Sequence, residues 1–358
     1  MRRRTTRLAS AAAAAVLLAA VLLAAVAVAA AASASPGPAG APTTAVTAGR
    51  AAAHAAARPP ARWVRVAVAT LWVRPGVARR VDAPACAVPS DPRAWVAGMT
   101  TTQKRWLVGR LETQALYGAR VYLLGTSGSW SRVAVAGQPT PRNRWGYPGW
   151  VPTQQLTATK PPATGRVAVV RRASAWLFET PDLTGRVLEL SYGTRLPAVA
   201  VAGEAVEIAL VDGTRAYVRG SVVALRETGT DRPPLSGARL VAEARRFLGL
   251  SYLWAGTSGF GLDCSGLTHL VFKTLGVTIP RDAGPQAMVG RRVGTRGALR
   301  AGDLVFFRTS SGTIHHVGLC VGDGRMIHAP ATGRPVAIVS LASEPYRSEF
   351  AGGRRLAP

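Results

Sequence analysis

The stretch GLSYLWAGTSGFGLDCSGLTHLVFKTL, residues 249–275, decides how the rest of the chain is interpreted. A loop rich in glycine and serine leads to Cys264, after which apolar residues recur at helical spacing, namely Leu267, Leu270, Val271 and Leu275. The pattern predicts a helix that starts at Cys264, with Asp263 as its N-cap. A thiol there faces unpaired N–H groups and the positive end of the helix dipole, which favour the thiolate. The residues fit a cysteine nucleophile, and they fit a buried structural cysteine equally well.

A cysteine nucleophile needs a base, and the segment that supplies one reads as two strands joined at Gly322-Asp323-Gly324. With this turn, His328 lies opposite Gly318 and on the same face as His316. Gly318 has no side chain, which leaves the space between the two imidazoles clear. His316 can therefore take the thiol proton while His328 orients its ring.

The remaining histidines do not fit this role. His315 should face away from His316, because neighbouring residues of a strand point to opposite sides. His269 lies five residues along the helix from Cys264, and His54 lies in a low-complexity segment. Metal binding is the weaker interpretation, because the spacing differs from that of structural zinc sites, and no cofactor is expected. An odd number of cysteines implies no disulfide framework: Cys86, Cys264 and Cys320.

Five motifs, in this order, resemble those of the NlpC/p-sixty cell-wall cysteine peptidases: Asp263-Cys264-Ser265-Gly266, Val277-Thr278-Ile279-Pro280-Arg281-Asp282, Gly302-Asp303-Leu304-Val305-Phe306-Phe307, His316-Val317-Gly318 and Met326-Ile327-His328-Ala329. The resemblance covers about residues 236–350. It implies a compact papain-like α+β fold and hydrolysis of peptide bonds in the stem peptides of peptidoglycan. Carried over to the matching positions, Cys264 is the nucleophile, His316 the base and His328 the third polar residue.

The resemblance also points to a substrate contact and to two departures. Tyr252 matches the family's tyrosine near the nucleophile, an oxyanion or substrate contact, although an aromatic side chain here could simply pack on the core. Gly284 stands where the family often has serine, which puts one substrate hydrogen bond in doubt. Cys320 stands where the family usually has tyrosine.

The expected bond follows from the same resemblance. Enzymes of this kind with SH3-like modules tend to cut between D-glutamate and the diamino acid, here diaminopimelate, at the third stem position. Asp263 and Asp282 could receive the free amine of the preceding L-alanine, and Ser265 could hydrogen-bond the stem backbone. Both aspartates could instead serve structure alone. The alternatives are an N-acetylmuramoyl-L-alanine amidase and a wall-binding protein without turnover, against which the intact cysteine–histidine set argues.

The N-terminus predicts export. Arginines at positions 2, 3, 4 and 7 precede an Ala/Val/Leu run, and Ala32-Ser33-Ala34 offers a small-residue cleavage site. Residues 1–34 are therefore interpreted as a signal peptide, and the protein as secreted, extracellular or associated with the cell wall. The alternative is an uncleaved single-span anchor, the one case in which the membrane would be a partner. Residues 35–61 read as a disordered linker of Ala, Pro, Gly and Thr.

Short Val/Trp/Tyr runs cut by Gly and Pro follow, which is an all-β pattern. Residues 62–158 and 166–226 repeat one unit and resemble two bacterial SH3-like barrels. The first carries an insertion in which Asp91 caps a helix. Its apolar side is marked by Trp95, Met99, Trp106, Leu107 and Leu111.

A polar linker at 227–235 separates these repeats from the catalytic domain, residues 236–358. Ser236 is the expected N-cap of the first helix of that domain. The domain order is thus two small all-β modules ahead of one α+β module.

The composition is strongly basic, with a formal net charge of +26. Of the 44 basic residues only Lys104, Lys160 and Lys273 are lysines, so 41 are arginines, which looks like a coding bias. The arginines are scattered, and no basic helix or zinc motif indicates nucleic acid. Peptidoglycan stem peptides and anionic wall polymers are the expected partners.

Overall fold

The computed structural model describes residues 57–229 and 233–358. The signal peptide expected at 1–34 and most of the linker expected at 35–61 lie outside the described residues and remain predictions. In the described part, none of the helices is long and apolar enough to cross a membrane.

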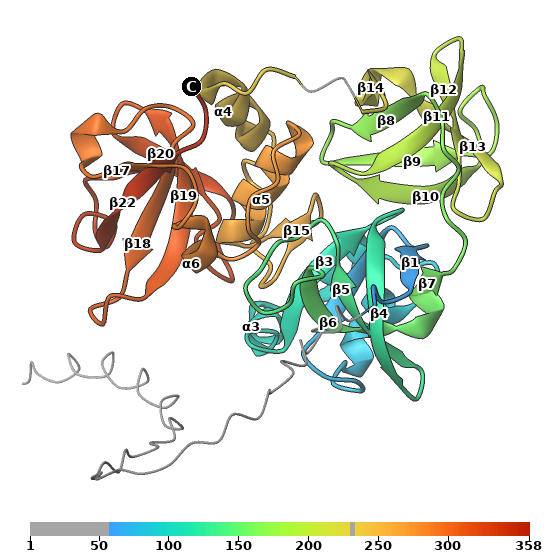
Figure 1. Cartoon of the computed structure of the whole chain (residues 1–358), viewed down its shortest axis with the longest axis horizontal. Helices are drawn as coiled ribbons and strands as arrows, with labels where there is room; N and C mark the ends of the chain where they lie inside the picture. Colours follow the sequence, from blue (N-terminus) through green and yellow to red (C-terminus); the bar gives the residue numbers. More distant parts are fainter. Residues whose placement is uncertain (1–56, 230–232) are drawn as a thin grey trace, which may run out of the picture. The chain divides into compact units, whose positions relative to one another are not determined.

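Two antiparallel β domains come first, and within the described residues each forms a seven-stranded sheet (Figure 1). The first domain consists of β1 (Ala61–Val64), β2 (Val68–Trp72), β3 (Leu111–Leu116), β4 (Arg120–Ser127), β5 (Trp130–Val135), β6 (Tyr147–Pro152) and β7 (Leu156–Thr157). The second consists of β8 (Arg166–Val170), β9 (Ser174–Phe178), β10 (Arg186–Ser191), β11 (Arg195–Ala202), β12 (Ala205–Ala209), β13 (Arg215–Arg219) and β14 (Val223–Glu227). The strand orders, β3-β2-β6-β5-β4-β1-β7 and β10-β9-β13-β12-β11-β8-β14, are the same, so the sequence repeat corresponds to a repeated topology.

The first β domain differs by an insertion between β2 and β3 that contains η1 (Arg80–Asp82), α1 (Ala83–Cys86), α2 (Pro92–Gly98) and α3 (Thr101–Trp106). Asp91 caps α2 by accepting a hydrogen bond from the backbone N–H of Ala94 at 2.8 Å, which confirms the predicted helix start. The predicted apolar side does not belong to one helix, however. Thr100 starts a second helix through its own capping box, and Leu111 lies on β3.

The C-terminal domain, from Ser236 onward, packs helices against a six-stranded antiparallel sheet in the described chain, with the order β17-β22-β18-β19-β20-β21 (Figure 1). Ser236 caps the first helix by accepting from the N–H of Arg239. The elements are α4 (Gly237–Arg245), β15 (Thr257–Ser258), β16 (Gly261–Leu262), α5 (Cys264–Thr274), α6 (Ala283–Gln286), β17 (Arg291–Val293), η4 (Arg296–Ala298), β18 (Leu304–Arg308), β19 (Ile314–Gly322), β20 (Arg325–His328), β21 (Ala337–Ser340) and β22 (Phe350–Arg355).

The apolar stripe of α5 explains why this helix lies on the sheet. Leu267, Leu270 and Val271 are buried in one core with Val317 and Leu319 of β19. Each buried side chain of this size contributes about 1.5–3 kcal/mol relative to exposure, so the stripe fixes the helix firmly. The first residue of α5 is thereby held near the strand that carries His316.

Each β domain shares a hydrophobic core with the C-terminal domain. The insertion of the first domain forms a core with Leu253 and Ala255, which precede β15. The second domain contributes Tyr192 to the core of the C-terminal domain, where its ring meets Phe247 edge-on at 4.9 Å. The first β domain therefore supports the loop before Cys264, and the second supports the region around α4 and α5.

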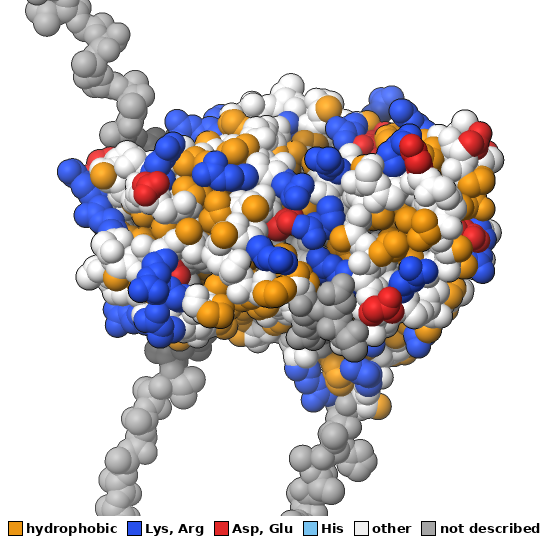
Figure 2. All heavy atoms as spheres, turned by 90° about the horizontal axis from the view of Figure 1, so that it is seen from above, with side chains coloured by type: hydrophobic (Ala, Val, Ile, Leu, Met, Phe, Trp, Pro, Cys, Tyr) orange, Lys and Arg blue, Asp and Glu red, His pale blue; other side chains and the backbone are white. Residues whose placement is uncertain are grey.

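Basic side chains are spread over the surface rather than collected in one place. Figure 2 shows Lys and Arg side chains distributed across the visible face among apolar and uncharged ones, with few acidic side chains between them. This distribution agrees with the scattered arginines of the sequence.

Candidate active site

Cys264 is the first residue of α5, as the sequence predicts. Asp263 is extended, with φ −93° and ψ 179°, and its Oδ1 accepts from the N–H of Gly266 at 2.6 Å. A Cβ on Gly266 would lie 2.0 Å from the carbonyl oxygen of Gly256, so only glycine lets the loop cross the helix this closely. Cys264, which follows this cap, is half-buried as a residue at the helix start.

The Cys264 thiol is protonated at rest, whereas the sequence suggested that the helix start would favour the thiolate. Burial raises the pKa of Cys264 to about 12, and the neighbouring Asp263 carboxylate adds to the rise. The backbone amides of Val317 and Ser265 act in the opposite direction but do not outweigh it. Desolvation and a nearby anion therefore overcome the helix dipole, and the resting nucleophile is the neutral thiol.

The histidine pair is assembled across two neighbouring strands. Nε2 of His316 lies 2.8 Å from Nδ1 of His328. The register pairs Leu319 with Ile327, so one residue further along His328 lies opposite Gly318, as predicted. Because Nε2 of His316 is engaged, Nδ1 is the nitrogen left to exchange a proton with a thiol.

The other predictions for this hairpin have different outcomes. His315 is exposed on the opposite side, where its Nε2 lies 3.0 Å from a carboxylate oxygen of Glu349. A Cβ on Gly318 would lie 2.5 Å from Sδ of Met326. Glycine at position 318 thus makes room for the side chain of Met326, whereas the sequence suggested that it clears the space between the imidazoles.

Both imidazoles are neutral at rest. Phe307 and Tyr346 lie beside them, with Tyr346 edge-on to His328 at 5.1 Å between ring centroids. Burial lowers the pKa of His316 to about 3 and that of His328 to about 4. A neutral imidazole can accept a proton, which is the state that a general base needs.

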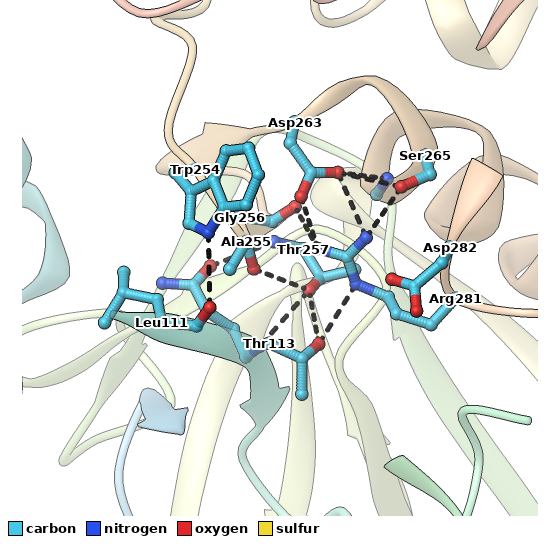
Figure 3. A network of polar contacts seen from close by, with 12 residues as sticks. Leu111, Thr113, Trp254, Ala255, Gly256, Thr257, Asp263, Ser265, Arg281 and Asp282 are labelled. Atoms are coloured by element: carbon cyan, nitrogen blue, oxygen red, sulfur yellow. Dashed lines mark hydrogen bonds and ion pairs between the residues drawn. The ribbon is translucent and has the colours of Figure 1, made fainter. Parts of the chain in front are cut away.

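A buried arginine holds the loop in front of the nucleophile (Figure 3). Arg281 donates to both carboxylate oxygens of Asp263, at 3.0 and 2.7 Å, and to Oγ of Ser265 at 3.0 Å. Asp263 and Ser265, predicted to contact substrate, are therefore occupied by Arg281 and by the helix cap. The physical reason is that a buried carboxylate requires a paired charge, which only the tertiary structure supplies.

The same arginine reaches the first β domain. Its Nε donates to Oγ1 of Thr113 on β3 at 3.1 Å, and Oγ1 of Thr113 lies 3.2 Å from Oγ1 of Thr257 (Figure 3). Close by, Nε1 of Trp254 donates to the carbonyl oxygen of Leu111 at 3.2 Å. Sequence reasoning missed these contacts, although an arginine directly before Asp282 in an apolar stretch was a usable signal.

Asp282 has a different environment from Asp263. Its Oδ1 accepts a hydrogen bond from the hydroxyl of Tyr147 at 3.1 Å, and in the described residues it takes part in no ion pair. Arg142 donates to the same hydroxyl at 3.1 Å and pairs with Glu112. Burial raises the pKa of Asp282. Tyr147 and Arg142 belong to the first β domain and were not predicted from the sequence.

The remaining predicted positions lie as follows. Tyr252 is buried, and burial together with Asp263 and Cys264 raises its pKa, so its hydroxyl stays protonated and can donate. Gly284 faces open space, since a Cβ there would meet nothing within 4 Å. Cys320 is buried in an apolar cluster, and all three cysteines are free. The described residues contain no group of three His, Cys, Asp or Glu placed to hold a metal ion.

A half-buried cysteine at the start of a helix, on a sheet that carries a hydrogen-bonded histidine pair, defines the site of a cysteine hydrolase. The model of the NlpC/P60 family matches residues 249–355, and that of the YKFC SH3b2 domain matches residues 170–225. The chain is 41% identical over 303 residues to the Gamma-D-glutamyl-L-lysine dipeptidyl-peptidase of Bacillus cereus, covering 83% of this chain and 91% of that protein. This protein belongs to the NlpC/P60 family.

Two further comparisons agree. The Gamma-D-glutamyl-L-lysine dipeptidyl-peptidase of Bacillus subtilis is 37% identical, over 81% of this chain and 96% of its own length. The crystal structure of an NlpC/P60 family protein from Bacillus cereus superposes with a TM-score of 0.78 at 39% identity. That structure covers 83% of this chain and is itself covered completely, so the similarity includes the β domains.

Proposed function

We propose that this protein is a peptidoglycan endopeptidase that cleaves the bond between γ-D-glutamate and the diamino acid of stem peptides, with Cys264 as nucleophile. The observation that carries the proposal is the bond between Nε2 of His316 and Nδ1 of His328, which leaves Nδ1 of His316 for the thiol. Both Bacillus relatives described above are named for a γ-D-glutamyl bond to a diamino acid, L-lysine.

The chemistry follows from the neutral resting pair. As Sγ of Cys264 attacks the carbonyl carbon of γ-D-glutamate, its proton passes to Nδ1 of His316, and His328 holds the imidazolium ring in place. The imidazolium then protonates the departing amine of the diamino acid, which leaves a thioester. Water, deprotonated by the same imidazole, hydrolyses the thioester and restores the thiol. The protonated hydroxyl of Tyr252 donates to the oxyanion.

Substrate selection rests on Asp282. Its carboxylate is held by Tyr147 and is free of any ion pair in the described structure, so it can receive the free amine of L-alanine. Asp263 is excluded from this task because Arg281 occupies both of its oxygens. A charge-assisted hydrogen bond contributes about 1.5–3 kcal/mol, which corresponds to about ten- to a hundredfold preference for the free amine.

The other parts of the chain fit this role. The helix-on-sheet arrangement of α5 and β19 supports a papain-like C-terminal domain. The strand order shared with the second β domain supports an SH3-like barrel for the first as well. Export through residues 1–34 and attraction of the basic surface to anionic wall polymers complete the proposal.

The test is mass spectrometry of L-Ala-γ-D-Glu-diaminopimelate after incubation with the protein, beside the same peptide N-acetylated. We expect release of L-Ala-γ-D-Glu, at least tenfold faster from the free amine. Equal rates on both peptides would remove the role of Asp282 but keep the peptidase. Glycan strands that carry intact stems are incubated in parallel, and release of whole stems from them without a cut after D-glutamate would replace the proposal with the amidase.

Variants test the residue roles. Cys264→Ala and His316→Ala should each lose activity by several orders of magnitude, because nucleophile and base act as one unit. His315→Ala is the matched control, since its side chain lies on the opposite face, and it should keep activity within about threefold. An inactive His315→Ala together with an active His316→Ala would contradict the assignment of the base.

A further inference from the structure

Asp282 has no ion pair among the described residues, although the chain contains 44 basic and only 18 acidic residues. Two arginines lie near it, Arg281 and Arg142, and their charges act to lower the pKa of its carboxyl against the effect of burial. A carboxylate withdrawn from water is normally paired with a cation. The state of Asp282 is therefore unusual, because two cations are close and neither is bound to it.

Each of these arginines is held by another carboxylate. Arg281 donates to both oxygens of Asp263 (Figure 3). Arg142 donates to both oxygens of Glu112, at 2.5 and 2.9 Å, and its guanidinium lies 5.1 Å from the centre of the Tyr147 ring. A bidentate pair fixes the direction of a guanidinium as well as its position. The two acids thus keep both cations turned away from Asp282.

Arg142 is the arginine with room to reach Asp282. Its Nη1 donates to the hydroxyl of Tyr147 at 3.1 Å, and this hydroxyl donates to Oδ1 of Asp282 at 3.1 Å. Nη1 is therefore at most 6.2 Å from Oδ1, the sum of these two distances. The side chain of Arg142 is 45% exposed, whereas that of Arg281 is 1% exposed. A turn of the Arg142 side chain by about 3 Å would bring it to hydrogen-bond distance from the carboxylate.

We propose that Glu112 is a specificity-determining residue that holds Arg142 away from Asp282 and so keeps this carboxylate open for the free amine of the substrate. The inference rests on the proposed role of Asp282. A guanidinium and an ammonium compete for one carboxylate, because both are cations that donate hydrogen bonds. Arginine only donates, so the Tyr147 oxygen accepts from Arg142 and its one proton goes to Oδ1 of Asp282, which leaves the other carboxylate oxygen for the amine.

Steady-state kinetics of L-Ala-γ-D-Glu-diaminopimelate and its N-acetylated form test the proposal. Selectivity is the ratio of kcat/KM for the free peptide to kcat/KM for the acetylated one. Glu112→Gln should lower this selectivity about tenfold, because Arg142 then pairs with Asp282. Adding Arg142→Met to Glu112→Gln should restore the selectivity, since the competing cation is removed. A purely structural role of Glu112 would instead slow both peptides alike, without such a rescue.

Two single variants complete the test. Arg142→Met alone should keep at least the wild-type selectivity, so a tenfold loss in this variant would overturn the proposal even if Glu112→Gln failed to fold. Glu204→Gln is the matched control, because it breaks an exposed pair with Arg219 in the second β domain and should leave selectivity unchanged.

Two outcomes for Glu112 also overturn the proposal. One is wild-type selectivity in Glu112→Gln. The other is a double variant that is as unselective as Glu112→Gln, which would make Glu112 itself the ligand of the amine. Failure of the proposed function gives a different result, because the wild-type protein would then cut both peptides at equal rates or cut neither.

Discussion

The two β domains share one strand order but serve the C-terminal domain differently. The first sends an insertion and β3 to the loop before Cys264, where Thr113 meets Arg281. The second lies against α4 and α5, where Tyr192 and Arg171 meet the buried Glu243. One fold thus acts as a wall of the active site in one copy and as a support behind the helices in the other.

This difference teaches that the role of a repeated module depends on its connections rather than its core. The strands of both copies bury their own apolar side chains in similar ways. What differs is the long connection between β2 and β3, compared with the short one between β9 and β10. The functional contacts come from this connection and from single polar residues of the strands, such as Thr113 on β3 and Tyr147 at the start of β6. Loops on a rigid scaffold commonly carry such contacts.

The largest expected effect on stability comes from breaking one of the two buried ion pairs, Arg281 with Asp263 and Arg171 with Glu243. Arg281→Met would leave the Asp263 carboxylate buried without its cation, and we expect a loss of about 3–5 kcal/mol in the free energy of unfolding. Arg171→Met would leave Glu243 with Arg246 and Tyr192, so we expect only about 1–2 kcal/mol. Urea unfolding of both variants measures the difference. Equal losses would show that the two interfaces are energetically alike.

We expect the buried histidines to make the stability of the C-terminal domain fall at acid pH, with no such contribution in the β domains. Burial lowers the pKa of His269 and His316 to about 3 and of His328 to about 4, below about 6.5 in the unfolded chain. The unfolded chain therefore binds more protons, so this stability is complete above about pH 6.5 and is lost as pH falls toward 4 and below. Residues 57–235 contain no histidine.

We expect urea unfolding between pH 7 and 4.5 to show a loss on the order of a few kcal/mol in the C-terminal domain. His269→Gln should flatten this dependence, and His315→Gln, at an exposed histidine, should leave it unchanged. A stability that stays constant over this range would contradict the buried neutral state of the three imidazoles.

Variants of Tyr147 and Tyr192, one tyrosine from each β domain, test whether the first domain serves catalysis and the second serves stability. Tyr147→Phe removes the hydrogen bond to Asp282, and we expect kcat/KM for the free-amine peptide to fall about tenfold. Tyr192→Phe removes the hydrogen bond to Glu243, so we expect a loss of about 1–3 kcal/mol in stability with kcat/KM nearly unchanged. Steady-state kinetics and urea unfolding of both variants provide the comparison. The division of roles fails if both variants lose activity and stability in the same proportion.

The smallest effect is expected at Gly284. It has room for a side chain, so Gly284→Ser should change stability by less than about 0.5 kcal/mol. Gly259 is the contrasting position, because a Cβ there would lie 1.8 Å from the carbonyl oxygen of Ala173 in the second β domain. Gly259→Ala should therefore cost about 1–3 kcal/mol. A larger thermal shift for Gly284→Ser than for Gly259→Ala would contradict these contacts.

Local sequence determined the parts of this protein that depend on neighbouring residues. Asp263 and Ser236 cap their helices as predicted, and the turn at Gly322-Asp323-Gly324 sets the register that brings His316 and His328 together. Helix caps, strand alternation and hairpin register act over a few residues, so they can be read from the chain alone. The repeat of the two β domains was visible for the same reason, as a pattern recurring along the sequence.

Only the tertiary structure decided which groups are charged and which are free to meet a substrate. From the sequence, Asp263, Ser265 and Asp282 are equally good candidates for substrate contact. In the structure Arg281 binds the side chains of Asp263 and Ser265. Asp282 accepts a hydrogen bond from Tyr147, 135 residues away, and has no ion pair among the described residues. The neutral state of the Cys264 thiol likewise depends on burial and on a nearby carboxylate rather than on the helix start. Desolvation and pairing with distant residues set these properties, and neither is encoded in any short stretch of the chain.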